Sequence, residues 1–377
     1  MPVVKTLQKT LAVLMAGLLL ASSTAFAQEK RQGQQKEEQM ATIRLDTDLV
    51  TLAVAVTNRD GKRSAAIAGD GLWAEDFAVY EDGVRQKIST FLTTDVPFNL
   101  VLLIDTSGST RDDVGLMRRS ALRFLDELRP QDRVAVVQFN KQVELLQDLT
   151  ANHDQVESAL SLLSPGSGTS FYDALQLTFA DVLMKSEGRK AVIALTDGVD
   201  SYGYQTYEQI LPLLEKAGAS LYFLELDTES FTEAGMVRDC SDESHFEFSQ
   251  KQLRKYSKYS GRKESGRLKL DSYLDGQGHC TMPRTERAEI NHRLYESARR
   301  ELREMGDKTG GHVYPVRQLQ QLDAVYSQIA AELHTQYSLA YYPSNEKHDG
   351  KWRNVKVEIK RPGFAARTRP GYRAPQN

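Results

Sequence analysis

The stretch Asn-Leu-Val-Leu-Leu-Ile-Asp-Thr-Ser-Gly-Ser at residues 99–109 decides the fold of this chain. Its five consecutive apolar residues, 100–104, are too few for a helix and predict a strand that is buried on both faces. The run ends in oxygen donors, because Asp105, Ser107 and Ser109 follow at alternate positions. A loop that leaves the strand can turn one carboxylate and two hydroxyls toward one point, an arrangement that suits a hard cation.

Strands and helices alternate on both sides of this stretch. Apolar strands are predicted at 134–139, 191–195 and 221–226, and residues with helical spacing lie between and after them. This alternation predicts an α/β domain over residues 96–335, with a doubly wound, mostly parallel sheet and helices on both faces. Residues 228–285 interrupt the pattern, since they are polar and lack a clear period, and we interpret them as an insertion.

A second, smaller unit is predicted from the two ends of the chain. Residues 41–95 hold β-branched segments and an Asp82-Gly83 hairpin signal, and residues 336–377 hold two more strand-like segments. An isolated hairpin is only marginally stable in water, so these strands need partners. We therefore expect the N-terminal and C-terminal segments to pack together as one antiparallel β module.

The first 27 residues have the pattern of a secretory signal peptide. Lys5 and Lys9 precede an apolar run, and a small-residue site, Ala25-Phe26-Ala27, follows it. The run is shorter than a membrane anchor requires. Cleavage after Ala27 would leave a flexible linker at 28–40 and a periplasmic or secreted protein without a stable membrane span.

The composition excludes some classes of function but does not indicate a particular one. The chain has 377 residues, 40% hydrophobic residues, 26% charged residues and a net charge of -3, which is typical of an ordinary globular protein and disfavours a nucleic-acid partner. The sequence does not indicate an oligomeric state.

The insertion contains both cysteines of the chain, Cys240 and Cys280. In an oxidising compartment they can form a disulfide that closes the insertion. A two-cysteine metal site with His279 is the alternative, although the close cysteine pairs of zinc sites are missing. The insertion also carries a basic run from Lys251 to Lys269, which predicts either a solvated surface or a contact surface for an acidic partner.

Two further oxygen donors are expected to join the first three. Asp197 follows the apolar strand 191–195, and Thr169 lies in the glycine-rich loop 165–170. In an open parallel sheet, ligands collect beyond the carboxyl ends of the strands, so the three loops can converge. Asp105, Ser107, Ser109, Thr169 and Asp197 would then form an all-oxygen site for a small divalent cation. The alternatives are that Asp105 only caps a helix and that Asp197-Gly198 is only a turn.

These five residues resemble a known family, the von Willebrand factor type A domain. In that family an Asp-x-Ser-x-Ser motif, a later Thr and a later Asp form the metal-ion-dependent adhesion site. The layout is more closely similar to secreted bacterial relatives that carry a short β segment before the domain and an arginine-rich strand pair after it. The resemblance implies that the two serines and usually the threonine bind the metal directly, with one aspartate bound directly and the other through water.

The family of these secreted relatives has a largely undefined function, so the resemblance implies the site, and we infer the function from that site and the signal peptide together. We expect an exported, adhesion-type protein-binding module that uses Mg²⁺, or alternatively Mn²⁺ or Ca²⁺, and binds an acidic residue of a protein partner. The first alternative is an assembly or scaffolding subunit of the cell envelope with a structural metal. A metal-dependent hydrolase is less favoured, because no general base and no catalytic histidine motif is evident, and we do not expect an enzyme.

Overall fold

The computed structural model describes residues 49–58, 71–242, 245–260 and 279–376. The predicted signal peptide, the linker and the first residues of the N-terminal segment lie outside these residues, as does the second half of the basic run. Among the helices of the described ranges, none combines the length and the apolar character that crossing a membrane requires.

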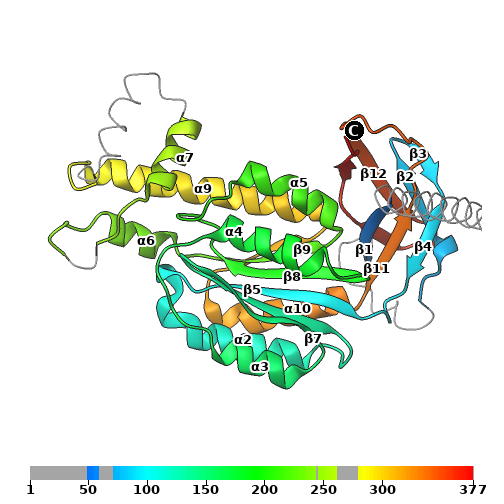
Figure 1. Ribbon diagram of the computed structural model, residues 1–377, viewed down its shortest axis with the longest axis horizontal. Coiled ribbons are helices and arrows are strands. Elements are labelled where there is room, and N and C mark those ends of the chain that lie inside the picture. Colours follow the sequence, from blue (N-terminus) through cyan, green and yellow to red (C-terminus); the bar gives the residue numbers. More distant parts are fainter. Residues whose placement is uncertain (1–48, 59–70, 243–244, 261–278, 377) are drawn as a thin grey trace, which may run out of the picture. The chain divides into compact units, whose positions relative to one another are not determined.

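A six-stranded sheet forms the centre of the α/β domain (Figure 1), with the strand order β10-β9-β8-β5-β6-β7. All neighbouring strands are parallel except β6 and β7, which form an antiparallel pair. The predicted mostly parallel sheet is therefore confirmed. The strands are β5 (Phe98–Asp105), β6 (Arg133–Phe139), β7 (Val143–Thr150), β8 (Arg189–Thr196), β9 (Ser220–Leu226) and β10 (His312–Val316).

The central strand β5 explains why the apolar run is continuous. All eight of its residues are buried, and successive side chains enter two different hydrophobic cores. Leu100, Leu102 and Ile104 belong to one core, and Val101 and Leu103 belong to the other. Because strand side chains alternate between faces, a strand with helices on both sides must be apolar at every position. Each such side chain contributes about 1.5–3 kcal/mol of burial free energy.

Helices cover both faces of this sheet (Figure 1). The first core packs against α2 (Val114–Asp126), α3 (His153–Ser161) and α10 (Leu322–Leu333), which follows the short helix η5 (Leu319–Gln321). The second core packs against α4 (Phe171–Gln176), the π-helical segment η4 (Leu177–Leu183), α5 (Tyr207–Ala217) and α9 (Arg284–Thr309). α4 and η4 follow one another directly and have different hydrogen-bond patterns.

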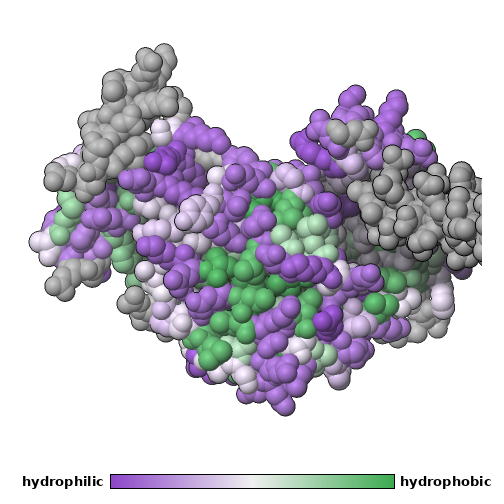
Figure 2. All heavy atoms as spheres, viewed as in Figure 1, coloured by the Kyte–Doolittle hydropathy of each residue, from purple (hydrophilic) through white to green (hydrophobic). Residues whose placement is uncertain are grey.

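The described residues of the predicted insertion form helices and a small core. They include α6 (Glu229–Met236) and α7 (Gln250–Ser260), and the small core joins Met236, Leu253 and Tyr256 to Ile290 of α9. The polar composition of residues 228–285 did not indicate these helices, because a few apolar residues suffice when α9 covers them. Hydrophilic residues dominate the surface over α7 in Figure 2. The predicted disulfide between Cys240 and Cys280 is confirmed, with the Cα atoms 5.9 Å apart.

The expected antiparallel β module is also confirmed. It consists of two four-stranded sheets that combine strands from both ends of the chain, and in one of them Leu52 pairs with Leu339, both fully buried. In the Asp82-Gly83 hairpin both residues have positive φ angles, 46° and 81°, as a tight two-residue turn requires. One sheet has the order β13 (Phe364–Arg367), β1 (Val50–Asn58), β11 (Gln336–Tyr341) and β4 (Ile88–Leu92); the other has the order β14 (Gly371–Arg373), β12 (Trp352–Ile359), β2 (Phe77–Glu81) and β3 (Val84–Gln86).

Candidate metal centre

Asp105 is the last residue of β5 and its side chain is fully buried. Its Oδ1 atom accepts a hydrogen bond from the backbone N–H of Ser107 (3.0 Å), and its Oδ2 atom accepts one from the Thr196 hydroxyl (2.7 Å). The Thr110 hydroxyl donates to the backbone carbonyls of Asp105 and Ser107, so the loop that enters η3 (Gly108–Asp113) is tied back to the strand. These contacts hold the carboxylate in one orientation at the carboxyl edge of the sheet.

Asp197 lies at the same edge, one residue beyond β8, and only 4% of it is exposed. Its Oδ1 atom accepts a hydrogen bond from the backbone N–H of Val199 (2.9 Å). Its Oδ2 atom accepts hydrogen bonds from the hydroxyls of Ser109 (3.3 Å), Thr228 (2.5 Å) and Tyr295 (3.3 Å). Two elements of the α/β domain, the start of α6 and α9, therefore orient this carboxylate.

The two serines connect the two aspartates. The hydroxyl oxygens of Ser107 and Ser109 are 3.3 Å apart, and Ser109 in turn donates to Asp197. Burial and the neighbouring Asp197 charge raise the pKa of Asp105 to about 7, and burial raises the pKa of Asp197 as well. Within the described ranges, no Lys, Arg or His side chain forms an ion pair with either carboxylate. Four of the five predicted ligands are thus in one hydrogen-bonded group that carries uncompensated negative charge.

Thr169 is placed by its backbone on the adjoining loop. The Gly166 N–H donates to the Thr106 carbonyl (2.7 Å), and the Thr169 N–H donates to the Ser201 hydroxyl (2.9 Å). The loop therefore lies against both aspartate-bearing segments. Thr169 is 6% exposed, and among the described residues its hydroxyl has no hydrogen-bond partner. The contacts do not join its side chain to the other four ligands.

The donor set fits a small divalent cation. It offers two carboxylates and three hydroxyls, and hard cations such as Mg²⁺ prefer oxygen ligands. The cost of burying two adjacent carboxylates would be relieved by a cation between them, which would also lower their pKa values. The two buried carboxylates and the hydroxyls between them therefore fit a divalent cation.

Three residues of the site were not identified as functional from the sequence. Thr196 orients Asp105, while Thr228 and Tyr295 orient Asp197. Thr228 follows the carboxyl end of β9, so the rule that ligands collect at this edge could have indicated it. Tyr295 lies in the middle of α9, and no local pattern pointed to it.

Two lysines in the first half of the basic run, Lys251 and Lys255, pair with buried acids rather than pointing into solvent. Lys251 forms an ion pair with buried Asp200, and Lys255 forms one with buried Glu301 over 2.8 Å. Lys258 pairs with Glu208 at the surface. Burial raises the pKa of Asp200 to about 6 in spite of the Lys251 charge. These three lysines therefore anchor α7 to the α/β domain, which does not support the predicted contact surface in this part of the run.

Comparisons with known proteins agree with this fold. Residues 100–199 match the family model for the von Willebrand factor type A domain. A comparison with curated protein sequences gives no match.

Three solved structures illustrate the similarity. The von Willebrand factor domain of the type V pili tip protein Mfa5 from Porphyromonas gingivalis matches with 23% identity and a TM-score of 0.26, over 28% of this chain and 39% of that chain. BatB from Bacteroides thetaiotaomicron matches with 18% identity and a TM-score of 0.37, over 63% and 98%. The mussel byssus protein PTMP1 with a zinc-occupied metal-ion-dependent adhesion site matches with 21% identity and a TM-score of 0.33, over 36% and 38%.

This chain spans 39% of the Mfa5 structure and about half, 49% and 51%, of two further PTMP1 structures. The sequence motif, the doubly wound sheet and the family match over residues 100–199 together identify one part of the chain: it contains a von Willebrand factor type A domain.

Proposed function

We propose that this protein is an exported, divalent-cation-dependent module that binds a protein partner. Asp105, Ser107, Ser109, Thr169 and Asp197 would hold the cation, which is Mg²⁺ or alternatively Mn²⁺ or Ca²⁺. The observation that carries this proposal is the pair of buried aspartates, which share one hydrogen-bonded group of hydroxyls and have no cationic partner among the described residues. A bound cation would supply an electrophilic position for an anionic ligand.

The chain's own residues would prepare that position. Thr196 and the Ser107 N–H hold Asp105, and Thr228 and Tyr295 hold Asp197, so the carboxylates need little rearrangement when the cation arrives. A cavity of about 290 Å³ lies beside Ser109 and Thr228. An aspartate or glutamate side chain of the partner would enter from this cavity and complete the coordination. No general base is required, so the proposed role is binding and not catalysis.

The proposed export rests on the sequence pattern at residues 1–27 and gains support from the disulfide. Disulfides form and persist in oxidising compartments and are rare in the cytosol. The Cys240–Cys280 bond is therefore consistent with a periplasmic or secreted protein.

The test separates metal binding from partner binding. Calorimetry with MgCl₂ is expected to give a binding isotherm for the wild type and none for Asp105→Ala. Asp126→Ala is the matched control, because Asp126 is exposed at the end of α2 and lies outside the site. Equal Mg²⁺ affinity in wild type and Asp105→Ala would overturn the site.

Partner binding is then measured by pull-down from envelope extract with the same three proteins, in Mg²⁺ and in EDTA. The proposal expects capture by wild type and Asp126→Ala in Mg²⁺ alone. Capture that persists in EDTA and in Asp105→Ala would favour the scaffolding alternative.

A further inference from the structure

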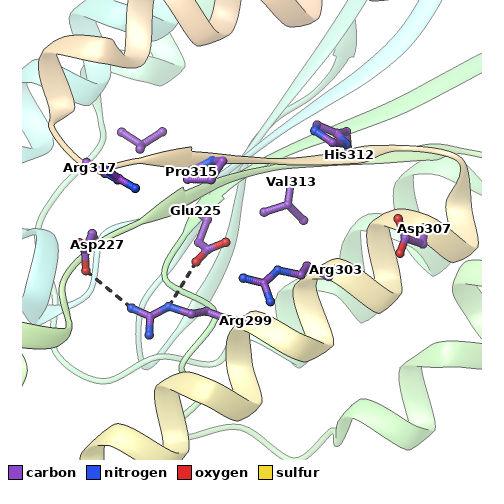
Figure 3. A pocket seen from close by; sticks show the side chains of 10 residues that line it. Glu225, Asp227, Arg299, Arg303, Asp307, His312, Val313, Pro315 and Arg317 are labelled. Atoms are coloured by element: carbon purple, nitrogen blue, oxygen red, sulfur yellow. Dashed lines mark ion pairs between the residues drawn. The ribbon is translucent and has the colours of Figure 1, made fainter. Parts of the chain in front are cut away.

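A second cavity, of about 470 Å³, lies between α9 and the edge strand β10 (Figure 3). Three arginines reach it, Arg299 and Arg303 from α9 and Arg317 from the residue after β10. Glu225 of β9 and Asp227 line the same cavity. Its arginines divide into a paired set, which forms ion pairs with acidic side chains, and an unpaired set, which forms none within the described ranges.

Arg299 belongs to the paired set. Its guanidinium lies 3.3 Å from Glu225, 3.6 Å from Asp227 and 2.6 Å from Glu229. The Arg299 guanidinium therefore forms ion pairs with all three carboxylates. The dashed lines in Figure 3 mark the pairs with Glu225 and Asp227. A fourth acid, Asp307 of α9, lines the cavity at the other end from Asp227 (Figure 3).

Arg303 and Arg317 form the unpaired set. Both are exposed, and within the described ranges neither guanidinium has a hydrogen bond or an ion pair. Figure 3 shows the two side chains directed toward the space between helix and strand from opposite sides. A guanidinium presents a fork of N–H donors that matches a carboxylate, and charge-assisted bonds of this kind are stronger than neutral ones.

This arginine pocket adjoins the candidate metal centre. Asp227, Val316 and Arg317 line both the cavity of about 470 Å³ and the cavity of about 290 Å³ that contains Ser109. Thr228, which orients Asp197, lines the smaller cavity. A ligand that reaches the metal through the smaller cavity would therefore pass Arg317.

We propose that Arg303 and Arg317 bind a second carboxylate of the partner, on the same acidic peptide segment whose first carboxylate occupies the metal. This inference rests on the proposed function and names its ligand class: a segment with two acidic side chains. The metal gives binding that depends on divalent cations, and the arginines select for a second negative charge.

The test uses fluorescein-labelled peptides that carry either one aspartate or two aspartates separated by glycine spacers of increasing length. Their affinity for the full chain is measured by fluorescence anisotropy in Mg²⁺ and in EDTA. The variants are Arg303→Gln/Arg317→Gln and Asp105→Ala. Arg293→Gln is the matched control, because Arg293 is exposed on the same helix and, within the described part of the chain, forms its ion pairs with Glu289 and Glu296. Circular dichroism checks that each variant is folded.

In Mg²⁺ the wild type and Arg293→Gln are expected to bind the best two-aspartate peptide about tenfold more tightly than the one-aspartate peptide. The Arg303→Gln/Arg317→Gln variant is expected to lose this preference and to keep its Mg²⁺ affinity. A preference that persists in that variant, or two peptides that the wild type binds equally or not at all, would overturn the inference. Failure of the proposed function gives a different result, since Asp105→Ala would then bind Mg²⁺ like the wild type.

Discussion

Thr228 donates a hydrogen bond from its hydroxyl to Asp197 Oδ2 over 2.5 Å, across 31 positions of sequence. Thr228 directly precedes α6, so the first residue of the predicted insertion is part of the candidate metal centre. Its hydroxyl also lies 2.9 Å from the Tyr295 hydroxyl, which is a second donor to the same carboxylate oxygen. The orientation of Asp197 is therefore set by α6 and α9 and not by its own loop alone.

The first prediction concerns this contact. Thr228→Val keeps the shape of the side chain and removes the donor, so Asp197 loses its shortest side-chain hydrogen bond. We expect the Mg²⁺ affinity to fall about tenfold, as is typical when a residue that orients a metal ligand is lost. The measurement is isothermal titration calorimetry.

Thr232→Val is the matched control for this experiment. Thr232 also bonds to Tyr295 (2.8 Å), but the side-chain hydrogen bonds to Asp197 Oδ2 among the described residues come from Ser109, Thr228 and Tyr295. Its substitution should leave the affinity nearly unchanged. Equal affinities in the two variants would show that Thr228 does not act through Asp197.

The second prediction concerns pH in the metal-free protein. The pKa of Asp105 is about 7 in the folded chain, against 3.8 for an ordinary aspartate. Between these values the folded chain keeps a proton that the unfolded chain has lost, so the free energy of unfolding falls as pH rises, by up to about 1.4 kcal/mol per pH unit. Urea denaturation in EDTA from pH 4 to pH 8 measures the slope.

Two further measurements, one on Asp105→Asn and one with added Mg²⁺, test whether Asp105 causes the slope. Asp105→Asn should reduce the slope without removing it, because the pKa values of Asp197 and Asp200 are raised in the same direction. Added Mg²⁺ should stabilise the wild type more at pH 8 than at pH 5, since the cation binds the ionised carboxylates. Metal-free stability that increases steadily over this range would contradict the raised pKa of Asp105.

Much of the fold could be predicted because its pattern is local. The five apolar residues at 100–104 predict a strand that is buried on both faces, and β5 has eight buried residues. The aspartates follow apolar strands, so the rule for parallel sheets places them at one edge. The β module could be predicted for a related reason, since isolated hairpins need partners and the two chain ends hold the available strands.

The remaining features depend on contacts between distant residues. Tyr295 reaches Asp197 only because α9 packs across the second core, and no periodicity marks which helical tyrosine faces a carboxylate. The lysines of α7 likewise look solvated in sequence, but Lys251 and Lys255 meet the buried acids Asp200 and Glu301. The polar composition therefore did not reveal helices α6 and α7 or the part of the site that Thr228 contributes.

The third prediction tests how α7 is anchored. Glu301 is almost fully buried and pairs with Lys255 over 2.8 Å, and it also accepts a hydrogen bond from the Tyr172 hydroxyl. Lys255→Met leaves a buried carboxylate without its cation, so we expect the free energy of unfolding to fall by about 3–5 kcal/mol. Urea denaturation at neutral pH is the measurement.

Lys258→Met is the matched control on the same helix. Lys258 pairs with Glu208 at the surface, where both side chains are more than half exposed. Exposed pairs contribute below about 1 kcal/mol, so this variant should be close to the wild type. Similar losses in both variants would mean that the burial of Glu301 does not matter.

The fourth prediction concerns the disulfide, which joins residues 40 positions apart and encloses α7. Closing a loop of this length stabilises a folded protein by up to about 4 kcal/mol, chiefly by restricting the unfolded chain. Cys240→Ser/Cys280→Ser should lower the free energy of unfolding by up to this amount and speed hydrogen exchange in α7. Lys251 still bonds to the carbonyls of Tyr202 and Gln205, so α7 should loosen without detaching fully.

The same substitution should spare the candidate metal centre, because its predicted ligands lie outside the loop that the disulfide closes. We therefore expect slow exchange in β5 and β8 and an unchanged Mg²⁺ affinity. Wild-type protein treated with a dithiol reductant is the control for the substitutions and should behave like the double variant. If reduction weakens Mg²⁺ binding instead, the insertion controls Asp197 through Thr228, and the disulfide belongs to the binding site as well as to the fold.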